Sequence, residues 1–197
     1  MPDALPNLSL TQGQLLWALE HGQEPGKLLK DQVRYLRQLG IPKNSANQVP
    51  GSGNRVRYDF HDLVELGLGV TALKHRFKPK DISAVLVDGR ESMRQAIELA
   101  WREMSEEQIS ANWIKSRGTI VPLRMNDFYL RLHDRRSETW GKVDVVLPGN
   151  MDPELEVFTP IEIFEDGEVK VLFPLQTLML PWVAWALEAP PIRTGPK

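Results

Sequence analysis

Residues 27–41 read KLLKDQVRYLRQLGI, and this run decides how the rest of the chain is interpreted. It predicts a helix over 28–39, and Gly40 and Pro42 mark the end of that helix. The run also begins a basic segment. From Lys27 to Tyr58 the bases are Lys27, Lys30, Arg34, Arg37, Lys43, Arg55 and Arg57, against the single acid Asp31. A segment with this surplus can meet a polyanion.

A second helix is expected just before this run. Thr11 can cap a helix over 12–20, in which Leu15, Leu16 and Leu19 share one face. Two glycines and a proline in 21–26 then break the helical pattern. Two helices joined by a break are therefore predicted over 12–39.

A hairpin is expected to follow the basic helix. Residues 43–54 are polar and rich in turn formers, and Arg55-Val56-Arg57-Tyr58 has strand character. Because side chains alternate along a strand, Arg55 and Arg57 would share one face. This face would carry two cations.

Helices are predicted again from Asp59. Apolar residues recur at helical spacing from Asp59 to about His75, and Pro79 can occupy the first turn of another short helix. Further on, a seam of Met93, Ile97, Ala100 and Met104 could pack on another helix. Ser105 and Gln108 could form a capping box that opens a short helix through Trp113.

The pattern changes to strands after Gly118, and a helix closes the chain. Strand candidates are Thr119–Leu123, Phe128–Leu132, Val143–Leu147, Ile161–Phe164 and Val169–Phe173. We interpret 119–174 as a small antiparallel sheet, followed by a helix over Leu175–Leu187 that Pro181 breaks or kinks. Trp182 and Trp185 in that helix are expected to pack in a core, with a ligand pocket or a partner surface as the alternative.

The charge is distributed unevenly along the 197 residues. The chain has 24 Lys+Arg and 26 Asp+Glu, a net charge of −2. Residues 1–90 carry +3 and residues 91–197 carry −5, which together give that value. The acidic part is a poor candidate for binding DNA and a plausible regulatory, dimerisation or partner-binding module.

A helix, a break, a second helix with bases and a basic hairpin are the parts of a winged helix-turn-helix, in the right order. Four segments carry a resemblance to a known family: Leu10–Leu16, Gln32–Ile41 (with Arg34-Tyr35 and Gly40-Ile41 matching best), Arg57–Asp59 and Asp62–Leu86. Over about Leu10 to Val87 the chain thus resembles the MerR-type regulators, the mercury-resistance family of DNA-binding proteins. The resemblance implies DNA contacts at Arg34, Tyr35, Arg57 and Tyr58.

Most catalytic and metal chemistry finds no support in the sequence. Cysteine is absent, which excludes disulfides and thiolate metal sites. The four histidines are scattered, and no serine lies in a nucleophile-elbow pattern. We therefore expect no catalytic residue, no metal and no cofactor. No membrane-spanning stretch or signal core is recognised, so the cytoplasm is the expected location.

Together these observations predict an α+β protein. We expect a MerR-like winged helix in 1–88, linker or dimerisation helices in 89–117, and an antiparallel sheet module with a C-terminal helix in 118–197. The expected function is bacterial transcription regulation by a homodimer on a pseudo-palindromic site in double-stranded DNA, with a small-molecule or protein effector as an optional partner of the C-terminal module. The predicted DNA-binding residues are Lys27, Lys30, Arg34, Tyr35, Arg37, Arg55, Arg57 and Tyr58. The alternatives are a protein-interaction adaptor and an excisionase-like architectural DNA-binding protein.

Overall fold

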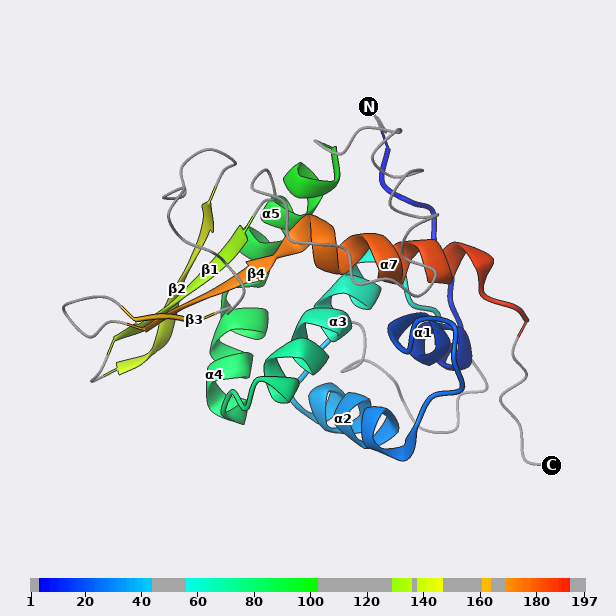
Figure 1. Ribbon diagram of the computed structural model, residues 1–197, viewed down its shortest axis with the longest axis horizontal. Coiled ribbons are helices and arrows are strands. Elements are labelled where there is room, and N and C mark those ends of the chain that lie inside the picture. Colours follow the sequence, from blue (N-terminus) through cyan, green and yellow to red (C-terminus); the bar gives the residue numbers. More distant parts are fainter. Residues whose placement is uncertain are drawn as a thin grey trace. The chain divides into compact units, whose positions relative to one another are not determined.

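The computed structural model describes residues 4–43, 56–102, 129–135, 138–146, 161–163 and 169–191 (Figure 1). The chain divides into two units. One, which we call the N-terminal unit, comprises Pro6–Pro79 and Pro181–Lys197, and the other comprises Met1–Leu5 and Lys80–Leu180. The division differs from the predicted boundaries, because the described residues 181–191 belong with the N-terminal helices.

Three helices form the first part of the N-terminal unit: α1 (Gln12–Leu19), α2 (Lys27–Gln38) and α3 (Phe60–Lys74). Their bounds agree within one residue with the ranges 12–20, 28–39 and 59–75 expected from the sequence. Capping boxes start α1 and α3. In the first, the backbone amide of Gln14 donates to the Thr11 hydroxyl at 3.3 Å. In the second, the backbone amide of Asp62 donates to the Asp59 carboxylate at 2.9 Å.

The same turn ends all three helices. The residue after each cap has a positive φ, and the next amide donates back to a carbonyl five residues earlier, as in the Schellman motif. The positive-φ residues are His21 (53°), Gly40 (80°) and Arg76 (64°), and the closing bonds run from Gly22 to Trp17, from Ile41 to Leu36 and from Phe77 to Ala72. Gly40 tolerates this conformation without strain, which explains why the basic helix stops there.

Two tryptophans of α7 (Leu175–Glu188) complete the core of the N-terminal unit. The Trp182 ring lies against Gly67 of α3, where an added Cβ would come within 2.5 Å of it. The Trp185 ring lies against Gly22 and meets Trp17 edge-on, with ring centroids 5.2 Å apart. Figure 1 shows this end of α7 beside α1 and α3. Core packing is thus confirmed for Trp182, which is 5% exposed, whereas Trp185 is half-buried.

After α3, the described part of the chain continues with three helical segments, α4 (Pro79–Ser83), the π-helix η2 (Ala84–Asp88) and α5 (Arg90–Arg102), which from Lys80 on belong to the second unit. On α5, Met93, Ile97 and Ala100 are buried at 0% exposure. The side-chain amide of Gln176, in α7, donates to the backbone carbonyl of Ala100 at 2.8 Å. Three residues of the predicted seam are therefore already covered within the chain, and a dimer would need a surface other than these three, while Met104 lies outside the described residues.

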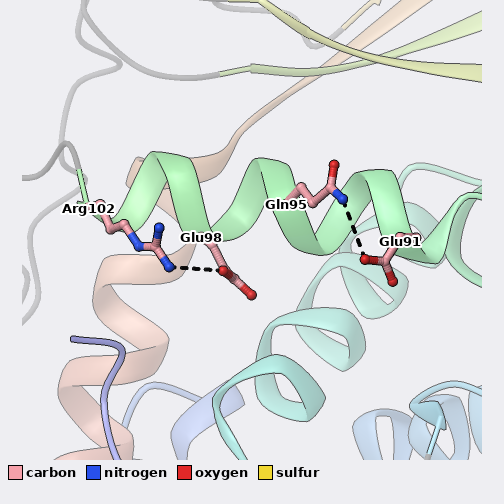
Figure 2. Close-up of polar contacts among 4 residues, drawn as sticks. All are labelled: Glu91, Gln95, Glu98 and Arg102. Atoms are coloured by element: carbon pink, nitrogen blue, oxygen red, sulfur yellow. Dashed lines mark hydrogen bonds and ion pairs between the residues drawn. The ribbon is translucent and has the colours of Figure 1, made fainter. Parts of the chain in front are cut away.

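The outer side of α5 carries polar pairs one helical turn apart. Figure 2 shows the Gln95 amide donating to Glu91 at 3.4 Å and Arg102 pairing with Glu98 at 3.2 Å. Exposed pairs at this spacing each contribute only about 0.2–0.5 kcal/mol. They support the helix and mark this side of it as solvated.

The backbone of the second unit also pairs four segments in the order β2-β1-β4-β3, all antiparallel. Their bounds are Tyr129–Arg135 for β1, Glu138–Val146 for β2, Ile161–Ile163 for β3 and Val169–Pro174 for β4. The strand expected at Thr119–Leu123 and the helix expected at 105–113 lie outside the described residues.

The predicted α+β fold class requires correction. Among the residues whose side chains the structure describes, 69% are helical and none belongs to a strand or a sheet. The described core is built by helices and the segments beside them, from Leu15 in α1 to Val183 in α7. The sequence prediction gave the runs of β-branched residues after Gly118 too much weight, because such runs indicate local conformation and not which elements bury the core.

Most of the predicted hairpin also lies outside the described residues. In the part that is described, Tyr58 forms an isolated antiparallel bridge with Leu10, with both backbone hydrogen bonds at 2.9 Å. The last residue of the predicted strand therefore pairs with the segment before α1.

The substitution Gly67→Ala should destabilise the protein by about 1–3 kcal/mol, because the new methyl group would overlap the Trp182 ring. Urea denaturation followed by circular dichroism measures the change. Trp182→Leu provides the matched background, since the smaller side chain leaves room for the methyl group. In that background Gly67→Ala should be neutral or stabilising, as alanine favours a helix. Equal losses in both backgrounds would contradict the packing described.

Candidate nucleic-acid interface

Helix α2 has one buried face and one basic face. Leu29, Val33 and Leu36 are 5%, 1% and 0% exposed, and α2 packs on α3. The bases Lys27, Lys30, Arg34 and Arg37 recur at spacings of three, four and three, which places them on a different side of the helix. Lys27, Lys30 and Arg34 are exposed, and Arg37 is half-buried. Burial of the apolar face therefore fixes which side chains α2 presents.

Three of these bases line a groove between α1 and α2, within the N-terminal unit. The groove has a volume of about 730 Å³. Its walls are Lys30, Arg34 and Arg37 from α2, Gln12, Gly13, Leu16 and Trp17 from α1, Glu24 and Pro25 from the connection, and Pro190 after α7. Three cations face one acid, Glu24, so the groove favours an anionic occupant.

Arg34 is held only weakly by its neighbour on the same helix. Its guanidinium pairs with Asp31 at 3.2 Å, and the two side chains are 73% and 47% exposed. An exposed pair of this kind contributes at most about 1 kcal/mol. A phosphate or a base edge can therefore replace Asp31 as the partner of Arg34 at little cost.

The predicted interface residues beyond α2 are placed unequally. Arg57 is exposed, and its guanidinium donates to the Ser9 carbonyl at 3.3 Å. Arg55 lies outside the described residues. Tyr35 is half-buried on α2, so its ring partly belongs to the core.

The inclusion of Tyr58 among the DNA-binding residues is wrong. Its side chain is 1% exposed, so the ring is a core group and cannot reach a ligand on the surface. The strand pattern placed Arg57 and Tyr58 on opposite sides, but it did not reveal which side would be covered.

Sequence reasoning missed the part of the groove that does not come from α2. Gln12 and Trp17 lie on the first predicted helix, but nothing in the helical spacing marked them as groove residues. Pro190 is brought in by the tertiary fold. It follows Ala189, whose carbonyl accepts a hydrogen bond from the Gln14 side chain at 3.2 Å. No sequence pattern links residues so far apart.

Other kinds of site find no support within the described residues. No group of three or more His, Asp or Glu side chains gathers there in a way that could hold a metal ion. No described helix has the length and apolar character needed to cross a membrane.

His21 lies in the connection that orients α2, and its pKa is shifted there. Burial lowers the pKa of His21, and the Lys74 cation lowers it further, while Glu20 acts in the opposite direction. A depressed pKa means that the unfolded state binds the proton more readily than the folded state does. The contribution of neutral His21 to stability is therefore complete above the unfolded-state pKa of about 6.5 and is lost as the pH falls through and below it.

The substitution His21→Asn should reduce the loss of stability between about pH 7.5 and about pH 5, because asparagine tolerates the positive φ and binds no proton. Urea denaturation of both proteins across this range measures the difference. The free energies of unfolding should converge, or the variant should become the more stable, at the acidic end. Parallel profiles would contradict the assignment.

In comparisons with protein-family models, curated proteins and solved structures, nothing matches this chain. The resemblance to MerR-type regulators accordingly stays a prediction from the sequence motifs.

Proposed function

We propose that the protein binds double-stranded DNA in a sequence-specific manner and regulates transcription, with α2 as the helix that enters the major groove. The observation that carries the proposal is the two-sided character of α2, whose apolar face is buried while Lys27, Lys30 and Arg34 remain exposed. The major groove of B-DNA is wide enough to admit a helix, and its base edges offer acceptors to lysine and arginine.

The surroundings of α2 support contacts with the sugar-phosphate backbone. The groove beside α2 carries three cations, and Arg57 is a further exposed base of the same unit. Such contacts fix the position of a protein on a duplex without reading its sequence. In this division of roles Arg34 and Arg37 read bases, whereas Arg57 and Lys30 neutralise phosphates.

The weak ion pair of Arg34 also fits a residue that changes partners on binding. In the free protein Asp31 balances its charge at 3.2 Å. A bidentate contact with a guanine edge, which contributes about 1–3 kcal/mol of discrimination, would be the stronger interaction. Binding would thus release Arg34 from Asp31 toward the DNA.

The protein would act as a dimer in the bacterial cytoplasm. A single small reading unit buries limited surface, and two-fold symmetry doubles the contacts on a pseudo-palindromic site. Because Met93 and Ile97 are covered within the chain, the proposed dimer would use a different surface from that seam. The acidic part of the chain would serve assembly or effector binding.

The division of roles predicts different effects for two substitutions. Arg34→Ala should reduce the affinity for the preferred duplex about 10–100-fold and relax the base preference, because a base contact is lost. Arg57→Ala should weaken binding to all duplexes evenly. It should also make the negative slope of log K against log salt shallower by about 0.9, because one phosphate contact is lost. Fluorescence anisotropy at several salt concentrations measures both effects.

Arg102→Ala is the matched control, since Arg102 is an exposed arginine of α5 in the other unit. It should leave affinity and salt slope unchanged. If Arg34→Ala and Arg57→Ala also left both quantities unchanged, α2 and the segment before α3 would not be the DNA-binding surface.

A further inference from the structure

Leu28 stands out on the exposed side of α2. Its side chain is 70% exposed, the highest value among the large hydrophobic residues that the structure finds exposed in its described part, the others being Leu99 (41%) and Leu187 (65%). It lies in the first turn of α2, between Lys27 and the buried Leu29. The Leu28 side chain therefore does not contribute to the buried core.

The helical spacing places Leu28 on the flank of α2 that lies away from the groove. Successive residues are separated by about 100° around a helix, so Leu28, Asp31 and Tyr35 form a neighbouring row to that of Lys30, Arg34 and Arg37. The row of bases lines the groove beside α1, and Leu28 does not. Helix α2 therefore presents bases on one flank and an apolar group at its N-terminal turn.

We infer that Leu28 is a specificity-determining residue that contacts the C5-methyl group of a thymine in the major groove. This inference rests on the proposed function and deepens it. Residues at the N-terminal turn of a recognition helix are those that reach base edges. The thymine methyl group is the apolar feature that a base pair presents in the major groove, and an apolar side chain is its natural partner.

The same chemistry makes binding sensitive to cytosine methylation. A 5-methylcytosine presents its methyl group at the same ring position as thymine does. The Leu28 side chain would contact only the methyl group, so it would not distinguish the two rings that can carry it. A cytosine placed at the thymine position should therefore bind better when it is methylated.

The experiment removes the two partners of the contact separately. Each thymine of the preferred duplex is replaced in turn by uracil, which lacks only the methyl group, and affinity is measured for the wild-type protein and for Leu28→Ala. Replacing one particular thymine in each half-site should lower the affinity of the wild-type protein for the duplex about fourfold. This factor corresponds to about 0.8 kcal/mol, the contribution of one buried methyl group. Leu28→Ala should bind the thymine and uracil forms of that site equally.

Leu187→Ala is the matched control, because Leu187 is 65% exposed on α7 and lies outside α2. It should retain the full fourfold loss at the same thymine. Circular dichroism should show unchanged helix content for both leucine variants, since both remove exposed side chains.

The outcomes separate this inference from the proposed function. If the wild-type protein prefers a duplex sequence but every thymine-to-uracil replacement affects wild type and Leu28→Ala alike, the role of Leu28 is refuted and DNA binding stands. If the wild-type protein prefers no duplex, the proposed function itself is refuted. A loss confined to one thymine of each half-site and abolished by Leu28→Ala, with a gain on methylation of a cytosine placed there, supports the contact.

Discussion

The packing of α7 tryptophans against glycines is the interaction on which the N-terminal unit depends. Trp182 fills the space over Gly67 in α3, and Trp185 fills the space beside Gly22, the residue that closes the end of α1. These contacts join residues from opposite ends of the sequence into one core. Because α2 in turn buries Leu29, Val33 and Leu36 and packs on α3, the orientation of its basic face follows from this core.

The basic face of α2 connects this packing to function. A helix that buries one side against a rigid partner presents a fixed set of side chains on the other, which is what a base-reading element requires. Lys30, Arg34 and Arg37 face a groove whose opposite wall is α1, so phosphate-binding and base-reading groups lie within one unit. The net charge of −2 hides this arrangement, because the acids are concentrated in the second half of the sequence.

The sequence predicted the helices of the N-terminal unit well and the rest less well, for physical reasons. Caps such as Thr11 and Asp59 and the positive-φ turn at Gly40 are local, so they can be recognised without tertiary information. The antiparallel sheet module of the predicted α+β fold was wrong, since β-branched runs report local preference only, and the strand pattern could not show that Tyr58 is buried. The bases of α2 were identified correctly as exposed or half-exposed, whereas Pro190 in the groove depends on tertiary contacts that no pattern records.

The central claim is that the exposed basic face of α2 reads a DNA sequence. Selection of the purified protein on a randomised duplex library, with sequencing at two salt concentrations and a mass measurement in solution, tests it most directly. The account predicts an enriched inverted repeat, a dimer mass and binding that weakens steeply as salt rises. Recovery of no enriched sequence at either salt concentration would contradict it.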